Sequence, residues 1–288
     1  MLVTGASGTL GRQIVSALRT ENCNVIASGR VTDDHVDAEW DISRDDSPSP
    51  ACRPTVVVHA AARVGSYQQS LAEADPLFDA NVSGSLRVAR WCVSEQVERL
   101  ILISGAIVYG KWSNASKSED DPVEPWAAGP YAVSKWCSEQ VASLVRCAGV
   151  ELTVLRLSSL YGTGYSSGVV QRFLKEGRET GQISLKPPFD DRFDLLHVSD
   201  AARAVERAVG MDRAGLWNVG SGEVTTIQEL GEMCAAEVNV PLGCSTEGPT
   251  RDARTINWVD DQKARDELGH KNLVPLKSGI SEIAKSIS

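Results

Sequence analysis

The chain is predicted to fold as an α/β protein, with a doubly wound parallel sheet and a smaller C-terminal α/β lobe. Short apolar runs alternate with longer amphipathic stretches through the first 160 of its 288 residues. The apolar runs lack the polar alternation of half-exposed strands, which is typical of strands buried on both faces of a parallel sheet. The stretches between them are long enough for helical crossovers, so right-handed β-α-β units follow.

Five runs rich in β-branched and apolar residues are the predicted strands, at 2–4, 24–28, 55–60, 99–104 and 151–157. Helices are predicted at 10–19, 75–96 and 131–148. After Tyr161, closely spaced glycines punctuate shorter elements, and two further helices are expected at 226–238 and 260–268. Residues 1–160 are therefore assigned to the sheet domain. Residues 161–288 are assigned mainly to the smaller lobe, with some segments expected to return to the sheet.

The composition restricts the kinds of partner. Acidic residues outnumber basic ones, 38 to 29, and no run of Lys and Arg resembles a phosphate-binding stripe, so a small ligand is expected rather than nucleic acid. The seven cysteines form no CxxC pair and no signal peptide is visible, which favours the reducing cytoplasm. No apolar stretch approaches the roughly 20 residues that cross a bilayer. The four histidines show no metal-binding spacing.

A glycine-rich turn follows the first predicted strand. In VTGASGTLG, Gly5, Gly8 and Gly11 precede a helix, and such residues let backbone amides approach a pyrophosphate at the helix N-terminus. The same turn supplies Ser7, Thr9 and Leu10 as further cofactor-binding candidates. The position of the motif at the first strand of an alternating pattern predicts a dinucleotide site.

The end of the second strand bears on the choice of dinucleotide. NAD binding normally places an acidic residue there, but this strand ends in ASGR and its first acids come several residues later. Arg30, with help from Arg12, is suited to a 2′-phosphate, so the pattern favours NADP while NAD stays open. Asp41 and Ile42 are expected along the adenine side.

Tyr131 and Lys135 lie four residues apart on a predicted helix, so both can reach one site. A free phenol has a pKa near 10 and is a poor base at neutral pH. A nearby ammonium and a cationic nicotinamide both favour the phenolate. AGP directly before the tyrosine is a helix-start signal.

Together these blocks resemble the extended short-chain dehydrogenase/reductases, the NAD-dependent epimerase/dehydratase group. The resemblance rests on TGASGTLG, VVHAAA, NVSGSLRV, SGAIVYG and YAVSK, and continues through VLRLSSLYG, LLHVSDAARAV, WNVGSGEVTTIQELG and DDQKARDELG. It runs nearly end to end. It implies a Rossmann domain with a C-terminal substrate lobe, a nucleotide-activated sugar as substrate, and a homodimer.

The resemblance also implies roles for individual residues. Tyr131 would be the acid/base, while Lys135 would bind the nicotinamide ribose and lower the pKa of the tyrosine. Asn81 would be a structural or relay residue, and Ala60, Ala61 and Ala62 would line the cofactor. Diphosphate binding in the family uses arginines near Arg192 and Arg251, each offset here by one residue, and Ser159 occupies the place of the family's Asn.

The strand end ISGAIVYG departs from the family pattern. Counting back from Val108, the hydroxyl residue that contacts the sugar is replaced by Gly105, with Ser104 before it. Neighbouring side chains of a strand point to opposite faces, but glycine permits local bending, so Ser104 is kept as a catalytic candidate. Ala106 and Ile107 replace the acids of the 4,6-dehydratases, which excludes elimination of water.

The sequence therefore predicts an NAD(P)-dependent oxidoreductase or epimerase. It would carry out 4-keto reduction or 4-epimerisation of a nucleotide sugar, with Gly105 and Ala106 in the substrate site. The alternative is a low-activity or non-catalytic dinucleotide-binding protein that acts as a redox sensor or scaffold, since the usual Ser or Thr is missing at Gly105.

Overall fold

The computed structural model describes residues 1–49, 53–65, 71–110, 112, 115–186, 188–244 and 256–287. Its largest sheet has seven strands in the order β10-β6-β5-β4-β1-β2-β3, and neighbouring strands run parallel. The strands of this sheet are β1 Leu2–Thr4, β2 Ile26–Gly29, β3 Ala38–Glu39, β4 Val56–His59, β5 Arg99–Gly105, β6 Glu151–Leu157 and β10 Leu216–Val219.

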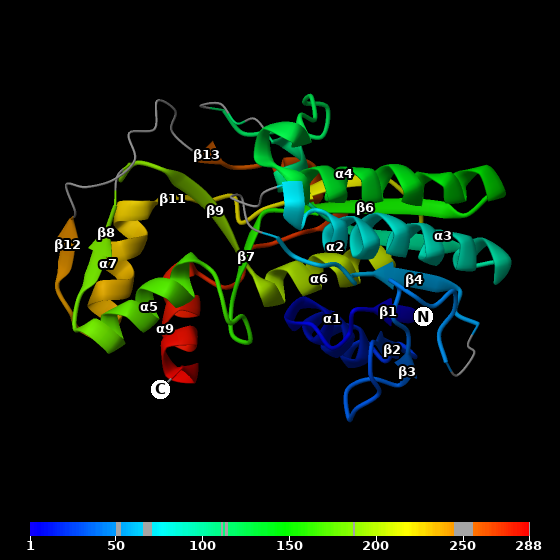
Figure 1. Ribbon diagram of the computed structural model, residues 1–288, viewed down its shortest axis with the longest axis horizontal. Helices are drawn as coiled ribbons and strands as arrows, with labels where there is room; N and C mark the ends of the chain where they lie inside the picture. The colour runs from blue at the N-terminus through cyan, green and yellow to red at the C-terminus, as the bar shows by residue number, and fades with distance from the viewer. Residues whose placement is uncertain are drawn as a thin grey trace.

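Helices cover both faces of this sheet, as Figure 1 shows. One face packs against α1 Thr9–Thr20, α6 Val198–Val209 and α8 Gln262–Leu268, and the other against α3 Gly84–Ser94 and α4 Pro130–Ser143. Consecutive strand residues divide between the two layers: Val3 and Val58 face α1 and α6, whereas Leu2 and Val57 face α3. Because the sheet is buried on both sides, the prediction of a doubly wound α/β fold is confirmed.

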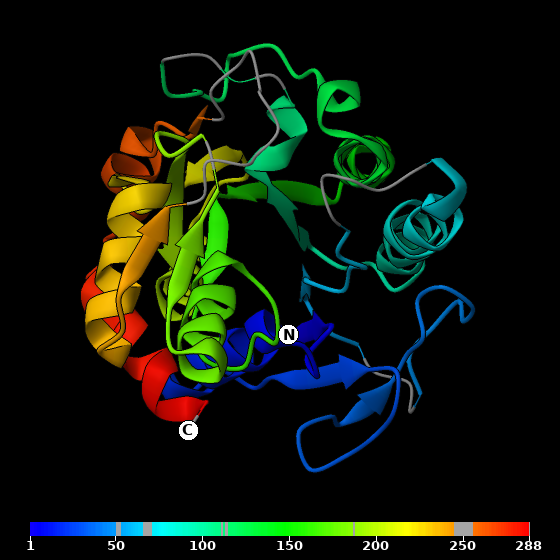
Figure 2. The ribbon, with the colours of Figure 1, turned by 60° about the vertical axis from the view of Figure 1, so that its left-hand side comes forward.

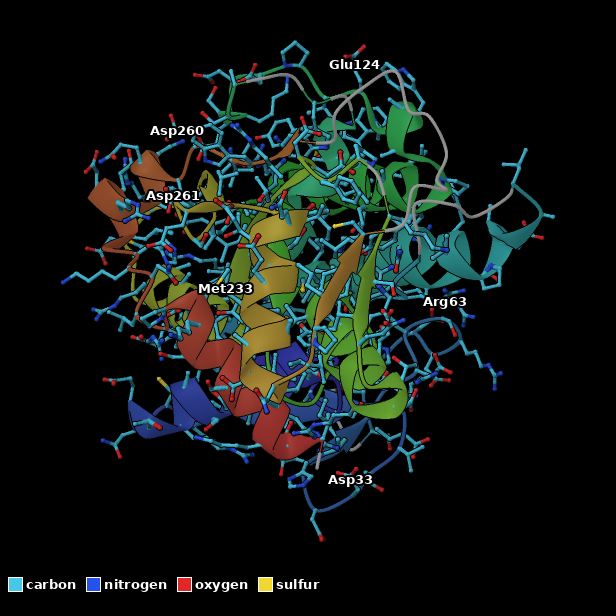
Figure 3. All side chains as sticks on the ribbon, turned by 90° about the vertical axis from the view of Figure 1, so that its left-hand side faces the viewer. Asp33, Arg63, Glu124, Met233, Asp260 and Asp261 are labelled. Atoms are coloured by element: carbon cyan, nitrogen blue, oxygen red, sulfur yellow. The ribbon has the colours of Figure 1, made fainter. Side chains whose placement is uncertain are left out.

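The smaller lobe lies at the left of Figure 1. Its strands are β7 Ser159–Tyr161, β8 Ile183–Leu185, β9 Arg192–His197, β11 Val224–Thr226, β12 Leu242–Cys244 and β13 Ile256–Asn257. β9 pairs with β7, β11 and β13, and β8 pairs with β12. Helices α5 Val169–Thr180, α7 Ile227–Val238 and α9 Leu276–Ser286 pack around a separate apolar core, which Met233 of α7 joins (Figure 3).

Three features differ from the elements expected from the sequence. The helix expected at 75–96 is divided into α2 Asp75–Phe78, a π-helical segment Asp79–Ser83 and α3. The helix expected at 131–148 ends its α-helical part at Ser143 and continues as the 3₁₀ segment Leu144–Ala148. The final helix is α9, which follows the helix expected at 260–268, and α5 and α6 were not among the predicted helices.

Short 3₁₀ segments cover Leu71–Glu73, Ala106–Tyr109 and Pro125–Ala128. In the described part of the chain, every helix is too short or too polar to cross a bilayer.

Candidate functional site

The glycine-rich turn forms a tight cradle between β1 and α1. Gly5 has a φ of +70°, and a Cβ atom there would lie 2.7 Å from the backbone of Ala61. A Cβ atom on Gly11 would lie 2.1 Å from the carbonyl oxygen of Gly5, while the Gly8 amide donates a 3.0 Å hydrogen bond to that oxygen. The turn therefore requires glycine at both ends, and α1 can begin directly against the sheet.

A cavity of about 530 Å³ opens at this cradle. Nine of the residues expected from the sequence to bind the cofactor line it: Gly5, Ser7, Gly8, Arg30, Asp41, Ile42, Ala60, Ala61 and Ala62. The lining also includes residues that the sequence reasoning missed, among them Arg44, Arg63 and Asp79. Arg63 is labelled at the right of Figure 3. A cradle that any Cβ would fill, beside a cavity of this size, fits an extended phosphate-containing cofactor.

Thr9, Leu10 and Gly11 belong to the first turns of α1 and do not line this cavity. The Thr9 hydroxyl instead donates a 2.8 Å hydrogen bond to the carbonyl oxygen of Gly164. This bond joins the start of α1 to the segment that enters the smaller lobe.

The basic residues near the cavity do not all face it. Arg30 is exposed and lines the cavity together with Asp41 and Arg44. Hydrogen bonds from Ser43, with smaller contributions from Arg44 and Arg30, hold the pKa of Asp41 below its usual value. Arg12 lines a different cavity of about 580 Å³, so its part in meeting a 2′-phosphate stays a prediction.

Tyr131 and Lys135 lie in the first turns of α4, which begins at Pro130 after Gly129 with a φ of +92°. The Lys135 ammonium is buried and donates a 2.8 Å hydrogen bond to the carbonyl oxygen of Ile103. Burial lowers the pKa of Lys135 to about 8, and the Glu139 carboxylate opposes that shift. Lys135 thus retains its proton at neutral pH and presents a positive charge near the end of β5.

Ser104 and Gly105 form the end of β5. The Ser104 hydroxyl donates a 2.5 Å hydrogen bond to Glu139, so its side chain points into the protein. Gly105 has extended backbone with φ −142°, which any residue can adopt. A Cβ atom at Gly105 would meet its nearest neighbours at 3.7 and 3.8 Å, an ordinary contact distance. The strand therefore stays regular, and Ser104 does not bend round to take the place of the missing hydroxyl.

Glu139 belongs to a buried polar network beneath this strand end. Its carboxylate accepts hydrogen bonds of 3.0 and 2.8 Å from Arg156 of β6, and both side chains are at most 7% exposed. Arg156 also donates to the Tyr109 hydroxyl at 3.1 Å, and Tyr109 donates to Asn218 of β10 at 2.8 Å. The network connects α4 with β5, β6 and β10.

Asn81 lies in the π-helical segment and is fully buried. Its amide exchanges hydrogen bonds with the backbone of Arg63 at 2.7 and 2.9 Å, and donates to the Ser134 hydroxyl at 2.9 Å. Ser134 in turn donates to the carbonyl oxygen of Tyr131. Asn81 therefore fixes the loop after β4 to the helix that carries Tyr131. The π-helical turn is the local departure that brings this side chain between the two.

The buried histidines have structural partners. His59 lies between Thr4 and Ser85, at 2.8 and 3.0 Å, and burial lowers its pKa to about 3. Burial also lowers the pKa of His197 and of His270. Within the described ranges, no group of three or more His, Cys, Asp or Glu side chains is arranged to hold a metal ion.

The substrate residues expected from the sequence are divided between the end of β5 and the smaller lobe. Ala106 is buried at the start of its 3₁₀ segment, and Ser159 begins β7. Arg192 is exposed at the start of β9. Hydrogen bonds from Thr226 lower the pKa of Glu229, and the positive charge of Arg192 makes a smaller contribution to that lowering. Arg251 lies outside the described residues.

Comparison with known proteins places this chain among relatives with the same architecture. The sequence profile of the NAD dependent epimerase/dehydratase family matches residues 1–220. The chain is 30% identical over 308 residues to a UDP-glucose 4-epimerase of Mycolicibacterium smegmatis, covering 98% of this chain and 96% of that protein. It is 25% identical over 314 residues to a dTDP-4-dehydro-6-deoxy-D-allose reductase of a Streptomyces species, covering 99% and 95%.

A solved structure is also similar in fold. The UDP-glucuronic acid 4-epimerase of Bacillus cereus, in complex with UDP-glucuronic acid and NAD, superposes with a TM-score of 0.85 at 20% identity. The match covers 99% of this chain and 98% of that one.

Replacing Gly11 with alanine should abolish dinucleotide binding. The new Cβ atom would lie 2.1 Å from the Gly5 carbonyl oxygen, and such overpacking typically costs about 1–3 kcal/mol of stability. Thermal unfolding with and without NAD would measure both effects. Gly243→Ala is the matched control, because its Cβ atom would approach no neighbour closer than 3.8 Å. Undiminished NAD binding by Gly11→Ala would show that the cradle is not needed.

Replacing Glu139 with glutamine should destabilise the fold by about 3–5 kcal/mol, because it leaves the buried Arg156 charge without a partner. Urea denaturation would measure the free energy of unfolding. Glu151→Gln is the control: Glu151 pairs with Arg99 at 2.8 Å but is 47% exposed, so its loss should cost less than about 1 kcal/mol. Equal losses in the two variants would contradict the importance assigned to burial.

Proposed function

This chain belongs to the NAD dependent epimerase/dehydratase family, and we propose that it is an NAD(P)-dependent oxidoreductase or epimerase acting on the sugar of a nucleotide sugar. The single observation that carries the proposal is the placing of Tyr131 and the buried, charged Lys135 on one helix at the end of β5. The relatives support the substrate class, since they are named for UDP- and dTDP-sugars. Net 4-keto reduction and 4-epimerisation both remain within the proposal.

The chemistry requires a group that exchanges a proton with the sugar oxygen while its carbon gains or loses hydride. A bound nicotinamide would supply the hydride chemistry. Tyr131 would be the acid/base, because the neighbouring ammonium of Lys135 stabilises the phenolate relative to the phenol. Lys135 is held for this task by the carbonyl oxygen of Ile103, and its burial keeps the charge effective at short range.

The cavity at the glycine cradle would hold the dinucleotide. Gly5, Gly8 and the N-terminus of α1 would face the pyrophosphate, Asp41 and Ile42 the adenosine, and Ala60 to Ala62 the part leading toward Tyr131. The smaller lobe, residues 161–288 apart from the segments that join the sheet, would cover the nucleotide sugar. Ser159, Arg192 and Arg251 remain the proposed contacts of the substrate in that lobe.

A homodimer, which the family resemblance implies, and a cytoplasmic location are part of this proposal. The six cysteines in the described part of the chain are all free thiols, which suits a reducing compartment.

Gly105 favours the second candidate function, a low-activity or non-catalytic dinucleotide-binding protein that acts as a redox sensor or scaffold. Ser104 is bound to Glu139 and does not supply the hydroxyl that Gly105 lacks. Losing one well-placed donor typically costs about a hundredfold to a thousandfold in rate. Such a protein would bind the dinucleotide but show no reduction of bound nicotinamide with any nucleotide sugar.

Tyr131→Phe should lower turnover at least about a hundredfold, because general acid–base catalysis commonly contributes that much. Reduction of bound nicotinamide by UDP-glucose, UDP-glucuronic acid and dTDP-glucose would measure it. Thermal unfolding with NAD should show binding unchanged, since the phenol lies outside the lining of the cradle cavity. If the phenylalanine variant turned over at the normal rate, Tyr131 would not be the acid/base.

Arg30→Ala should weaken NADP binding about tenfold, the equivalent of about 1.4 kcal/mol, while NAD binding changes less than twofold. The reason is that Arg30 is the lining residue proposed to meet a 2′-phosphate. Arg12→Ala is the control, because Arg12 lines the other cavity. Titration of both dinucleotides would decide the matter, and an equal loss for NAD and NADP would remove the preference for NADP.

A further inference from the structure

The strand topology brings the loop after β4 to the glycine cradle. β1 and β4 are neighbouring parallel strands, and Thr4 at the end of β1 is the register partner of His59 at the end of β4. In Figure 2 the blue N-terminal segments, which carry the cradle, lie below the teal helix α3. The cradle and the loop that begins at Ala60 therefore leave the same edge of the sheet, where ligands of such sheets bind.

This loop touches the cradle directly. A Cβ atom on Gly5 would lie 2.7 Å from the backbone of Ala61, so glycine lets the two segments meet. The Ala61 amide also donates a 3.2 Å hydrogen bond to the Thr4 hydroxyl. Arg63 follows two residues later, and two residues of extended chain span at most about 7 Å. The backbone of Arg63 thus lies close to the residue that touches the cradle.

Asn81 holds the backbone of Arg63 in this place. Its buried amide accepts a 2.7 Å hydrogen bond from the Arg63 amide and donates a 2.9 Å hydrogen bond to the Arg63 carbonyl oxygen. One side chain therefore engages both main-chain polar groups of Arg63, while Arg63 itself remains exposed. A side chain on a fixed backbone loses less freedom on binding a ligand than one on a mobile loop.

The Arg63 guanidinium is free to meet a ligand. Among the described residues that line the cradle cavity, three are arginines: Arg30, Arg44 and Arg63. The Arg44 guanidinium lies 3.7 Å from the Asp41 carboxylate, and Arg30 is the residue proposed to meet a 2′-phosphate. Within the described part of the chain, no ion pair engages Arg63, although Asp79 lines the same cavity.

The start of α1 also favours an anion at the cradle. Gly8, the residue before the helix, supplies no side-chain cap, and the first turn carries no acidic residue. The first amides of the helix therefore keep their partial positive charge, equivalent to about half an elementary charge. Because each phosphate of a dinucleotide is negatively charged, the helix terminus alone leaves much of that charge unbalanced.

We propose that the Arg63 side chain binds the pyrophosphate of the dinucleotide, together with the N-terminus of α1. This inference rests on the proposed function, because it needs a dinucleotide in the cradle cavity. The planar guanidinium would donate hydrogen bonds to the phosphate oxygens. NAD and NADP share the pyrophosphate, so Arg63 would contribute to the affinity for both, whereas Arg30 would distinguish between them.

The test compares Arg63→Gln with the unaltered protein by titration of NAD, NADP and adenosine. Both dinucleotides should bind at least about tenfold more weakly to the variant, since a charged donor to phosphate is lost. Adenosine has no phosphate, so its affinity should change less than about twofold. Arg53→Gln is the matched control: the Arg53 side chain is 92% exposed, 4.0 Å from Glu95 and outside the cavity lining, so all three affinities should be unchanged.

The salt dependence of binding separates a phosphate contact from a structural effect. Salt screens exposed charges, so a higher ionic strength should weaken NAD binding to the unaltered protein more than NAD binding to Arg63→Gln. The unfolding midpoint without ligand should be the same for both, since the hydrogen bonds from Asn81 are to the backbone.

Four results would overturn the role of Arg63. They are NAD binding by Arg63→Gln at normal affinity, an equal loss for adenosine, a loss confined to NADP, and the same salt dependence in both proteins.

The proposed function fails in a different way. If the unaltered protein bound NAD but reduced none of it with UDP-glucose, UDP-glucuronic acid or dTDP-glucose, the assigned reaction would be wrong, and the binding result for Arg63 would stand. Normal turnover together with unchanged NAD affinity in Arg63→Gln would reject only the role of Arg63. An unaltered protein that bound neither dinucleotide would overturn both.

Discussion

A carboxylate and a guanidinium, both withdrawn from water, hold α4 against the sheet. Glu139 of α4 forms an ion pair with Arg156 of β6 and accepts a hydrogen bond from the Ser104 hydroxyl of β5. Arg156 also donates a hydrogen bond to the Tyr109 hydroxyl. A buried pair of this kind is costly to form and more costly to break, so it specifies one position of the helix. Lys135 lies one turn earlier on the same helix. Its bond to Ile103 depends on that position, and so does the placing of Tyr131.

The second constraint links the two parts of the molecule. The cradle on β1 and α1 and the loop after β7 are far apart in sequence, yet Thr9 and Gly164 meet through one hydrogen bond. Movement of the smaller lobe would therefore displace or strain the first turn of α1, which is the part of the chain proposed to face the pyrophosphate. The proposed cofactor cradle and the lobe proposed to cover the substrate are therefore in direct contact at this point.

Much of the fold could be predicted from the sequence, because buried parallel strands appear as continuous apolar runs and Gly5 and Gly11 mark a strand-to-helix turn. The alternation of a regular strand also predicted that the Ser104 side chain points away from the face on which a side chain at position 105 would lie. The cavity that Arg12 lines could not be predicted, because it depends on how α1 is rotated against the sheet. The π-helical turn at Asn81 is set by contacts with Arg63 and Ser134.

The conformation of the chain at Gly105 does not require glycine, unlike that of the glycine-rich turn. Its backbone is extended and the space beside it accepts a Cβ atom, in contrast to Gly5 and Gly11, where the fold forbids one. The absence of a hydroxyl there is consequently a matter of chemistry and not of folding. A small side chain could therefore be introduced at this position without a clash at its Cβ atom, so the fold leaves the choice of residue at the end of β5 open to selection for function.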